Sequence, residues 1–356
     1  SRLYTSIVAF LVRHVFAMVL VWAAAMGLTY YAFTSVPTGF LPEEDDGLIM
    51  LNVQLPDGAS LQRTDAVMKR VINILKSTDG VADSGIISGY SILDGAGPTL
   101  GLGFVALRPW DERTKHGRSK QVIAKELARK FAQIQEGIVF PFSLPPIIGI
   151  GQGSGFEMWL EDRVGIGLPS LAQVANEIAL EAQRDPRLHG VNCTFRAEVP
   201  TIFADVDRIK VLTHKVPLQS VFDTLQAFLG STYVNDFNEF GRIWQVKVQA
   251  DAMYRATPNH ISKLQVRDIE GRMLPLGSLV RVDYALSPLR VDRFNMFPAI
   301  RLMGEPGPGR SSGQALTAME ELAATELPSG VTYEWSGMAY QEKKVGGQIF
   351  IVFALA

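Results

Sequence analysis

The chain has 356 residues, 47% of them hydrophobic and 20% charged, a balance that excludes a disordered polymer. The formal net charge is -2 and there is no long basic run, so we expect no nucleic-acid partner. The single cysteine, Cys193, excludes an internal disulfide framework and a cysteine-rich zinc site. The length allows two or three domains.

An apolar run lies close to the N-terminus. Residues 15–33 carry no charge, and the run is long enough to cross a bilayer core of about 30 Å as a helix. Arg2 and Arg13 precede the run, which places the N-terminus on the cytoplasmic side. A secretory signal peptide would instead have an apolar core of about 7–15 residues and a cleavage site of small residues. We therefore predict a transmembrane helix in residues 1–36.

The last residues are also apolar. Residues 345–356 end in the run IFIVFALA, which is too short to span a bilayer. We expect this segment to be the truncated start of a second transmembrane helix.

Strand–helix–strand units recur between the two apolar segments. Their opening strands are predicted at 48–55, 100–107, 156–160 and 299–303. A helix with apolar residues at helical spacing follows each of these strands, and Gly followed by Val or Ile ends each helix at positions 80, 137, 190 and 330. With a repeat period of about 55 residues, the last gap holds an insertion of roughly 85 residues.

Two consecutive strand–helix–strand units make one ferredoxin-like βαββαβ domain. The sequence therefore predicts an α+β protein with a transmembrane helix and two such domains, the second interrupted by a separate piece. Within that piece, alternating apolar residues predict strands at 243–248 and 274–282.

No catalytic or metal-binding constellation emerges from the sequence, so we expect no enzyme activity, no cofactor and no metal site. The five histidines are scattered, without a helical pair suited to a metal. The run GIGQGSG at 149–155 leads into a predicted strand and not a helix, which favours a flexible hinge over a phosphate site. The acidic run at 43–46 is predicted to be a solvated turn and not a calcium site.

The predicted transmembrane helix has no carboxylate or lysine within its apolar span. Ionisable groups inside the membrane are the usual proton carriers. If the protein is ion-driven, its proton relay therefore lies on helices outside this chain.

Four motifs together resemble one family of transporters. They are PTGFLPEEDDG at 37–47, VQLP at 53–56, GSTYVNDF at 230–237 and SGMAYQE at 336–342. In this order, and across the whole chain, they resemble the second periplasmic loop of resistance–nodulation–division transporters of the hydrophobe/amphiphile efflux branch. The resemblance implies that the chain runs from the seventh transmembrane helix, which it includes, to the start of the eighth.

The resemblance implies a drug:proton antiporter, a homotrimer of the bacterial inner membrane with most of this segment in the periplasm. Such a pump would contact membrane lipid and export hydrophobic and amphiphilic small molecules. A periplasmic adaptor protein and an outer-membrane channel would complete a tripartite complex. This chain would supply drug-pocket and docking surfaces, but not the proton relay.

The resemblance also divides the chain into subdomains. Residues 37–154 would form the porter subdomain PC1, and residues 155–202 with 290–340 would form the porter subdomain PC2. Residues 203–289 would form the docking subdomain DC, inserted into PC2.

Two drug pockets follow from the resemblance, separated by a loop at about 90–98. Matched residue by residue, the deep pocket would be lined by Leu48, Met50, Ile87, Tyr90, Ile92 and Phe104. The pocket nearer the entrance would be lined by Phe156, Met158 and Leu160, with Arg196 near its mouth. Aromatic and methionine side chains suit promiscuous binding because their apolar contacts are large and adaptable.

The chain departs from the family pattern at two places. The separating loop lacks the usual arginine and phenylalanines, and Met158 stands where phenylalanine is common. Both departures concern the range of substrates and not the fold.

Two alternatives stay open at this point. A heavy-metal exporter of the same superfamily would need a methionine cluster, for which Met50 and Met158 alone are too few. A membrane-anchored periplasmic binding or docking module without transport is the other alternative. Copper titration would test the first, and the size of the native polypeptide would test the second.

Overall fold

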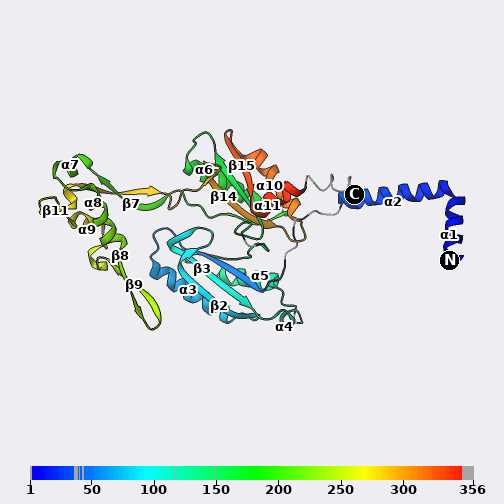
Figure 1. The fold of residues 1–356 in the computed structure, drawn as a ribbon, viewed down its shortest axis with the longest axis horizontal. Coiled ribbons are helices and arrows are strands. Elements are labelled where there is room, and N and C mark those ends of the chain that lie inside the picture. Colours follow the sequence, from blue (N-terminus) through cyan, green and yellow to red (C-terminus); the bar gives the residue numbers. More distant parts are fainter. Residues whose placement is uncertain are drawn as a thin grey trace. The chain divides into compact units, whose positions relative to one another are not determined.

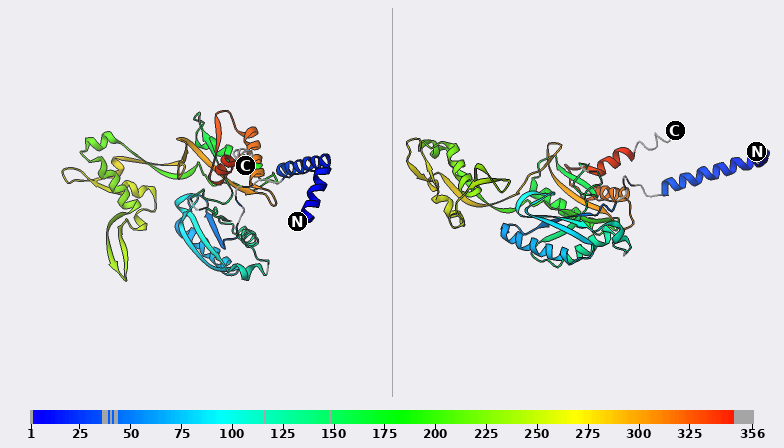
Figure 2. Two further views of the ribbon diagram at one scale, coloured as in Figure 1. Left: turned by 45° about the vertical axis from the view of Figure 1, so that its right-hand side comes forward. Right: turned by 60° about the horizontal axis from the view of Figure 1, so that its bottom comes forward.

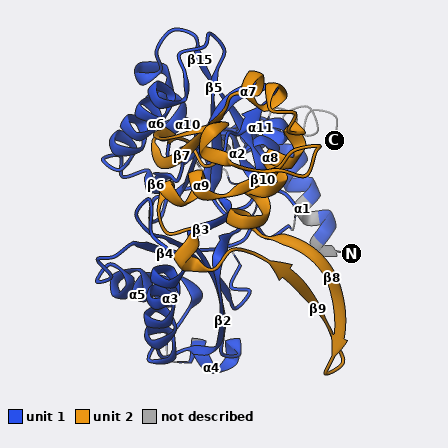
Figure 3. Ribbon diagram, turned by 90° about the vertical axis from the view of Figure 1, so that its left-hand side faces the viewer, with its two compact units in different colours: residues 1–196, 290–356 blue, residues 197–289 orange. Residues whose placement is uncertain are grey.

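The computed structural model describes residues 2–35, 39, 41, 44–115, 117–147 and 149–346 (Figure 1). It contains both helices and sheets, in agreement with the predicted α+β class. The chain divides into two compact units, residues 1–196 with 290–356 and residues 197–289, which Figure 3 colours separately. Residues 347–356, predicted as part of a truncated transmembrane helix, lie outside the described residues.

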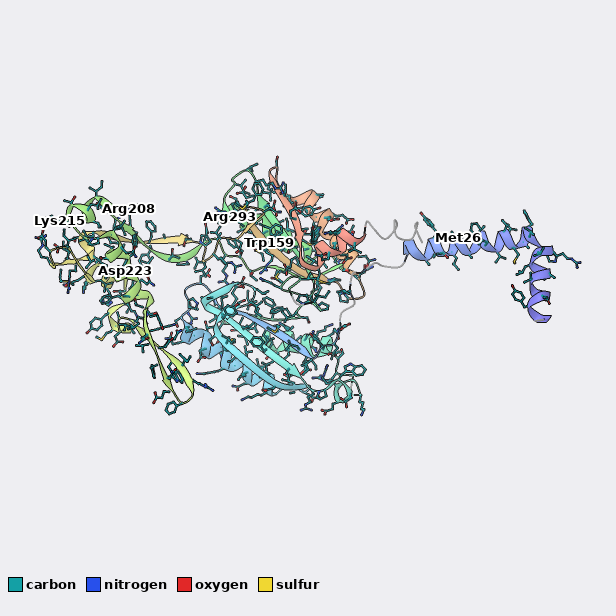
Figure 4. All side chains as sticks on the ribbon, viewed as in Figure 1. Met26, Trp159, Arg208, Lys215, Asp223 and Arg293 are labelled. Atoms are coloured by element: carbon teal, nitrogen blue, oxygen red, sulfur yellow. The ribbon has the colours of Figure 1, made fainter. Side chains whose placement is uncertain are left out.

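Two helices open the chain, α1 (Arg2–Arg13) and α2 (Val15–Ser35). Among the residues that the structure describes, α2 alone is long and apolar enough to cross a membrane. No residue of its window Val15–Ala32 is buried against the rest of the chain, and Figure 4 shows the side chain of Met26 and its neighbours projecting from the helix. A helix that is apolar on every side needs an apolar environment, which is the basis of the membrane prediction.

Four antiparallel strands form the first sheet, in the order β2-β3-β1-β4. They are β1 (Leu48–Gln54), β2 (Val81–Ser91), β3 (Gly95–Leu107) and β4 (Ile138–Phe142). Helix α3 (Leu61–Lys76) connects β1 to β2, and the helices α4 (Trp110–Thr114) and α5 (Lys120–Phe131) connect β3 to β4.

Both long helices pack on one face of the first sheet, as Figures 1 and 2 show. Ile49, Leu51 and Val53 of β1 point to that face, and none is more than 1% exposed. The start of α3 is fixed by Ser60, whose side-chain oxygen accepts a hydrogen bond from the backbone N–H of Arg63. Alternation along the strand and capping of the helix thus place the main apolar core between the helices and the sheet.

The second sheet repeats this arrangement. Its strands are β5 (Phe156–Asp162), β6 (Leu188–Cys193), β14 (Phe297–Pro306), β15 (Val331–Ser336) and the short β13 (Arg293–Phe294). Its helices are α6 (Leu168–Ala182), α10 (Ser312–Glu326) and α11 (Gly337–Gly346), which follow β5, β14 and β15. The order β6-β14-β5-β15 corresponds strand for strand to β2-β3-β1-β4, so the internal repeat predicted from the sequence is present.

Most of the predicted glycines mark the starts of strands and not the ends of helices, since α3 ends at Lys76, α5 at Phe131 and α10 at Glu326. Three of the four Gly-Val or Gly-Ile pairs directly precede a strand, as Gly80 and Gly330 do, each with a φ of +91°. The prediction is wrong at Gly190, which lies inside β6, whereas α6 already ends at Ala182. Pro186 explains the earlier end, because proline and the residue before it disfavour helix.

The unit of residues 197–289 is inserted between β6 and β14. Its first and last strands, β7 (Val199–Val206) and β12 (Val280–Ser287), pair along their whole length. The elements between them are α7 (Arg208–Thr213), α8 (Leu218–Leu225), β8 (Thr232–Glu239), β9 (Arg242–Val248), α9 (Pro258–Lys263), β10 (Gln265–Arg267) and β11 (Met273–Pro275). A core of its own is formed by Val211, Val216, Val221, Leu264, Val266, Leu276, Leu279 and Val280.

Two predictions concern this unit directly. The strand predicted at 243–248 is observed as β9, whereas the strand predicted at 274–282 is interrupted by a 3-10 turn at Leu276–Ser278. The unit starts at Ala197, ahead of the predicted boundary at Phe203, because β7 pairs with β12.

The acidic segment after α2 is a solvated turn only in part, because Glu44 and Asp46 are exposed but Asp45 is largely shielded. Asp45 accepts hydrogen bonds from Nη1 and Nη2 of Arg113 at 2.9 and 2.8 Å, and from the backbone N–H of Lys120 at 2.8 Å. Nζ of Lys120 donates to Asp46 at 2.6 Å. The hydrogen bonds from Arg113 hold the pKa of Asp45 below its usual value of 3.8. Sequence reasoning missed this pair because 68 positions separate its members. Glu43 lies outside the described residues.

Candidate functional site

The first sheet carries apolar side chains on both faces. Because neighbouring side chains alternate along a strand, Leu48 and Met50 point away from the face that α3 and α5 cover. A second apolar cluster lies on this opposite face, and we call it the helix-free cluster. Its buried members are Met50, Leu93, Leu102 and Phe142, and its half-buried members are Leu48, Ile92, Phe140, Leu144 and Met303.

Strand pairing extends this face beyond the cluster itself. Met50 pairs with Phe104 on β3 and with Phe142 on β4, and Ile87 on β2 pairs with Leu102. Directly paired residues of antiparallel strands share a face. Phe104 is 37% exposed and Ile87 is 45% exposed, so both offer apolar surface beside a buried apolar floor.

The structure therefore brings together most of the residues predicted for the deep pocket. Leu48, Met50 and Ile92 belong to the helix-free cluster, and Ile87 and Phe104 lie on the same face of neighbouring strands. Tyr90, the sixth predicted residue, is 44% exposed and follows an irregularity in the pairing of β2 with β3.

The residues predicted for the entrance pocket lie elsewhere. Phe156 is 4% exposed, and Met158 and Leu160 are fully buried. The ring of Phe156 packs edge-on against Trp335 at 5.9 Å, and the indole of Trp335 donates to Glu320 on α10 at 3.0 Å. These three strand residues thus point into the core between the second sheet and its helices, where no ligand could reach them in this structure.

The guanidinium of Arg196 is occupied by neighbours in the chain. Its Nη1 donates to the carbonyl oxygen of Leu55 at 3.1 Å and to the carboxylate of Asp57 at 2.6 Å. Asp57 belongs to the turn between β1 and α3. In this structure Arg196 ties two segments together and keeps only a partly exposed side chain.

Sequence reasoning missed part of the helix-free cluster. Phe140 and Phe142 alternate on β4, which is a recognisable strand signal, and pairing with β1 would then have placed Phe142 beside Met50. Met303 gives no such signal, because it reaches the cluster from the second sheet.

The one thiol of the chain, that of Cys193, is held in its unreactive protonated form. Burial raises the pKa of the Cys193 thiol to about 11, so the thiol stays protonated at neutral pH. Within the described residues, no group of three or more His, Cys, Asp or Glu side chains is arranged so that it could hold a metal ion. What the site offers chemically is an apolar surface of aliphatic, aromatic and methionine side chains.

The fold is that of an α+β chain with two sheets of matching strand order and an apolar face on the first sheet, and the described residues include one helix suited to a membrane. Comparison with known proteins identifies the family: the chain belongs to the AcrB/AcrD/AcrF family, whose sequence profile matches residues 1–356. This match confirms the resemblance to resistance–nodulation–division efflux transporters that the motifs indicate.

Curated relatives agree with this assignment. The chain is 33% identical over 356 residues to the multidrug export protein AcrF of Escherichia coli, covering 99% of this chain and 34% of that protein. It is 31% identical over 355 residues to the toluene efflux pump membrane transporter TtgB of Pseudomonas putida, again covering 99% of this chain and 34% of the relative. The chain thus spans about a third of the length of the curated relatives it matches.

Proposed function

We propose that the chain is part of an inner-membrane pump that exports hydrophobic and amphiphilic compounds by drug:proton antiport. Family membership and the helix-free cluster support this proposal. The names of the relatives, which mention multidrug export and toluene efflux, favour a drug and solvent exporter over a heavy-metal exporter.

Within such a pump, the two sheets would be the porter subdomains PC1 and PC2. The shared strand order and the helix after each first and third strand support a ferredoxin-like βαββαβ fold for both. The unit of residues 197–289, which interrupts the second sheet, would be the docking subdomain DC.

The membrane assignment rests on α2. This helix would cross the inner membrane in contact with lipid, and the two sheets and the inserted unit would lie in the periplasm. The proton relay would lie on other helices of the pump, because α2 has no carboxylate, lysine, arginine or histidine in its apolar window.

The helix-free cluster is the surface that we assign to the substrate. Three strands of the first sheet, a loop and Met303 of the second sheet contribute its residues, and exposed apolar side chains such as Phe104 and Ile87 flank its buried floor. Hydrophobic compounds are held by apolar area and adaptable side chains, without a requirement for paired charges.

Export by intact cells tests this assignment. The protein at its full natural length would be produced in cells whose own efflux pumps are deleted, and accumulation of a hydrophobic fluorescent dye would be followed. We expect the variants Phe104→Ala and Ile87→Ala to accumulate more dye than the wild type, because each removes apolar contact at the site. Val122→Ala is the matched control, since Val122 is also 45% exposed but lies on α5.

The comparison with the control decides the outcome. Equal accumulation in the wild type, both site variants and the control, at equal protein amounts, would remove the helix-free cluster from the transport route. A protein that fails to lower dye accumulation in any form would remove the proposal of export itself.

Partners are proposed on the same basis. The pump would work as a homotrimer with a periplasmic adaptor protein and an outer-membrane channel, in a tripartite complex. Every residue of the β8–β9 hairpin is exposed, and Phe237, Trp244, Val246 and Val248 lie on one face. An isolated two-stranded hairpin is marginally stable in water, so this apolar face favours burial against a further surface of the assembly.

A further inference from the structure

A short loop at residues 92–94 joins β2 to β3 and is hydrogen-bonded by arginines of the second half of the unit. Nη2 of Arg301, on β14, donates a hydrogen bond to the carbonyl oxygen of Leu93 at 2.8 Å. Nη2 of Arg290 approaches the same oxygen at 3.5 Å. One backbone oxygen of the loop thus faces two guanidinium groups from the second half of the unit.

The loop also covers the helix-free cluster. Leu93 is 2% exposed and Ile92 is half-buried, and both pack in the cluster. The hydroxyl oxygen of Ser91 accepts hydrogen bonds from the backbone N–H groups of Leu93 and Asp94, at 3.0 and 3.2 Å. Movement of this loop would therefore expose apolar surface of the cluster.

Arg301 is a buried cation without a carboxylate partner in the described part of the chain. Its Nη1 donates to the amide oxygen of Gln152 at 2.6 Å, and its guanidinium lies 5.5 Å from the ring centre of Trp159, which Figure 4 labels. Burial lowers the pKa of Arg301 from its usual value. Neutral oxygens and an aromatic ring offset only part of the cost of burying a charge.

The loop itself contains a carboxylate, Asp94, that lacks a hydrogen-bond partner for one of its oxygens. One oxygen of Asp94 accepts from the Thr194 hydroxyl at 2.6 Å, whereas Oδ2 is buried and has no hydrogen-bond partner. Asp94 directly follows Leu93, the residue that Arg301 holds. Gly89 and Gly95, on either side of the loop, have φ of +87° and +85°, a conformation that glycine adopts without steric cost.

We propose that Arg301 is a positioning residue that holds the loop over the helix-free cluster, and that Asp94 replaces Leu93 as its partner when the loop is released. The held state leaves one buried cation and one buried carboxylate oxygen unpaired, and the released state pairs them. A loop with two such arrangements is a two-state element, which a substrate at the cluster would bias toward release. This inference rests on the proposed function, because it concerns access to the proposed substrate surface.

Charge around Arg301 argues against an external anion as its natural partner. The carboxylates of Glu157, Asp94 and Asp292 all act on the guanidinium, and only Arg290 opposes them. An anionic ligand would meet repulsion from these three carboxylates. A group of the chain itself, already tethered beside Arg301, is the better partner.

Hydrogen exchange of the loop tests the proposal on the protein at its full natural length in detergent. Mass spectrometry would follow amide exchange in a peptide covering residues 90–98. We expect Arg301→Met to speed exchange about tenfold, the scale set by losing a hydrogen bond from a charged group. Arg187→Met is the matched control, because Arg187 binds Asp185 and Glu321 on the same half of the unit.

The direction in which a second variant changes amide exchange distinguishes the proposed exchange of partners from a general loss of stability. Asp94→Asn keeps an oxygen for Thr194 but removes the charge that would pair with Arg301 on release. We expect this variant to slow exchange of the loop, and to have no such effect in the Arg301→Met background. Faster exchange in Asp94→Asn, or unchanged exchange in Arg301→Met, would overturn the proposal. Dye export by Phe104→Ala is measured separately, so a failure of the proposed Arg301–Asp94 pairing and a failure of the proposed function give different results.

Discussion

Met50 and Met158 show how little separates a site residue from a core residue. Both are at most 1% exposed and both lie on the central part of a strand. Met50 points to the face without helices, whereas Met158 lies beside Trp335 on the face that α10 covers. The difference is set by which face of each sheet the helices occupy, and not by any property of the methionines.

The same reasoning changes what is expected of Phe156. We predict that Phe156→Ala raises drug sensitivity mainly by destabilising the protein, by about 3–5 kcal/mol, because it empties a packed core. Immunoblots of the membrane fraction would measure the amount of protein beside the growth assay. Normal amounts together with raised sensitivity would instead favour a direct role of Phe156 at a ligand.

Asp45 stabilises the fold through its ion pair with Arg113, although it lies in an acidic run that is typical of an exposed turn. We predict that Asp45→Asn lowers the free energy of unfolding at pH 7 by about 3 kcal/mol, because the Arg113 side chain, 2% exposed, would lose its carboxylate. Chemical unfolding of the purified protein, followed by tryptophan fluorescence, would measure the change. Asp65→Asn is the control, since Asp65 pairs with Lys69 at an exposed position.

The same pair predicts a dependence on pH. The pKa of Asp45 is lower in the folded state than its usual 3.8, so its contribution to stability is complete above that value. The contribution is lost as the pH falls through the lower pKa of the folded state. The difference between the wild type and Asp45→Asn should therefore be constant from neutral pH to about pH 5 and shrink below about pH 4. A difference that stays constant under strong acid would show that the ion pair is not its source.

Among the elements, the strands and helices of the repeat could be predicted because their signals are local. The Ser60 cap and the alternation of Ile49 and Leu51 are readable within a few residues. The early end of α6 and the break at Leu276–Ser278 were missed, since proline and a short turn override the apolar pattern there. The face that each strand presents to a ligand was not predictable, because Leu48 and Ile49 look alike until the helices are placed.

The β8–β9 hairpin is exposed along both of its strands. We predict that Val246→Lys weakens assembly of the protein with its partners, because it places a charge on the apolar face of the hairpin. Cross-linking in membranes and size-exclusion chromatography of the purified protein would report the change.

Gln245→Lys is the matched control for the hairpin. It adds the same charge on the adjacent residue of β9, and adjacent residues of a strand face opposite ways. Equal assembly in both variants would mean that the apolar face is not an interface.

At the scale of the whole molecule, the connection of the inserted unit suggests that the second sheet folds without it. We predict that replacing residues 200–286 by a three-residue turn leaves the second sheet folded, because Val199 and Ser287 already pair and the new turn would have the length of the β2–β3 connection. The amount of protein in the membrane and its resistance to limited proteolysis would measure folding. Loss of the protein from the membrane would show that the sheet needs the insertion.

The β7–β12 ladder also has a mechanical consequence. Both covalent chains that connect the inserted unit run along this ladder, with Val199 paired to Ser287 at one end and Val206 paired to Val280 at the other. A pull along the ladder loads two polypeptide backbones in parallel, whose bonds are far stronger than the hydrogen bonds between them. Two-stranded ribbons also carry a larger twist than wider sheets. We therefore expect the β7–β12 ladder to keep its length under such a pull and to respond by a change of twist.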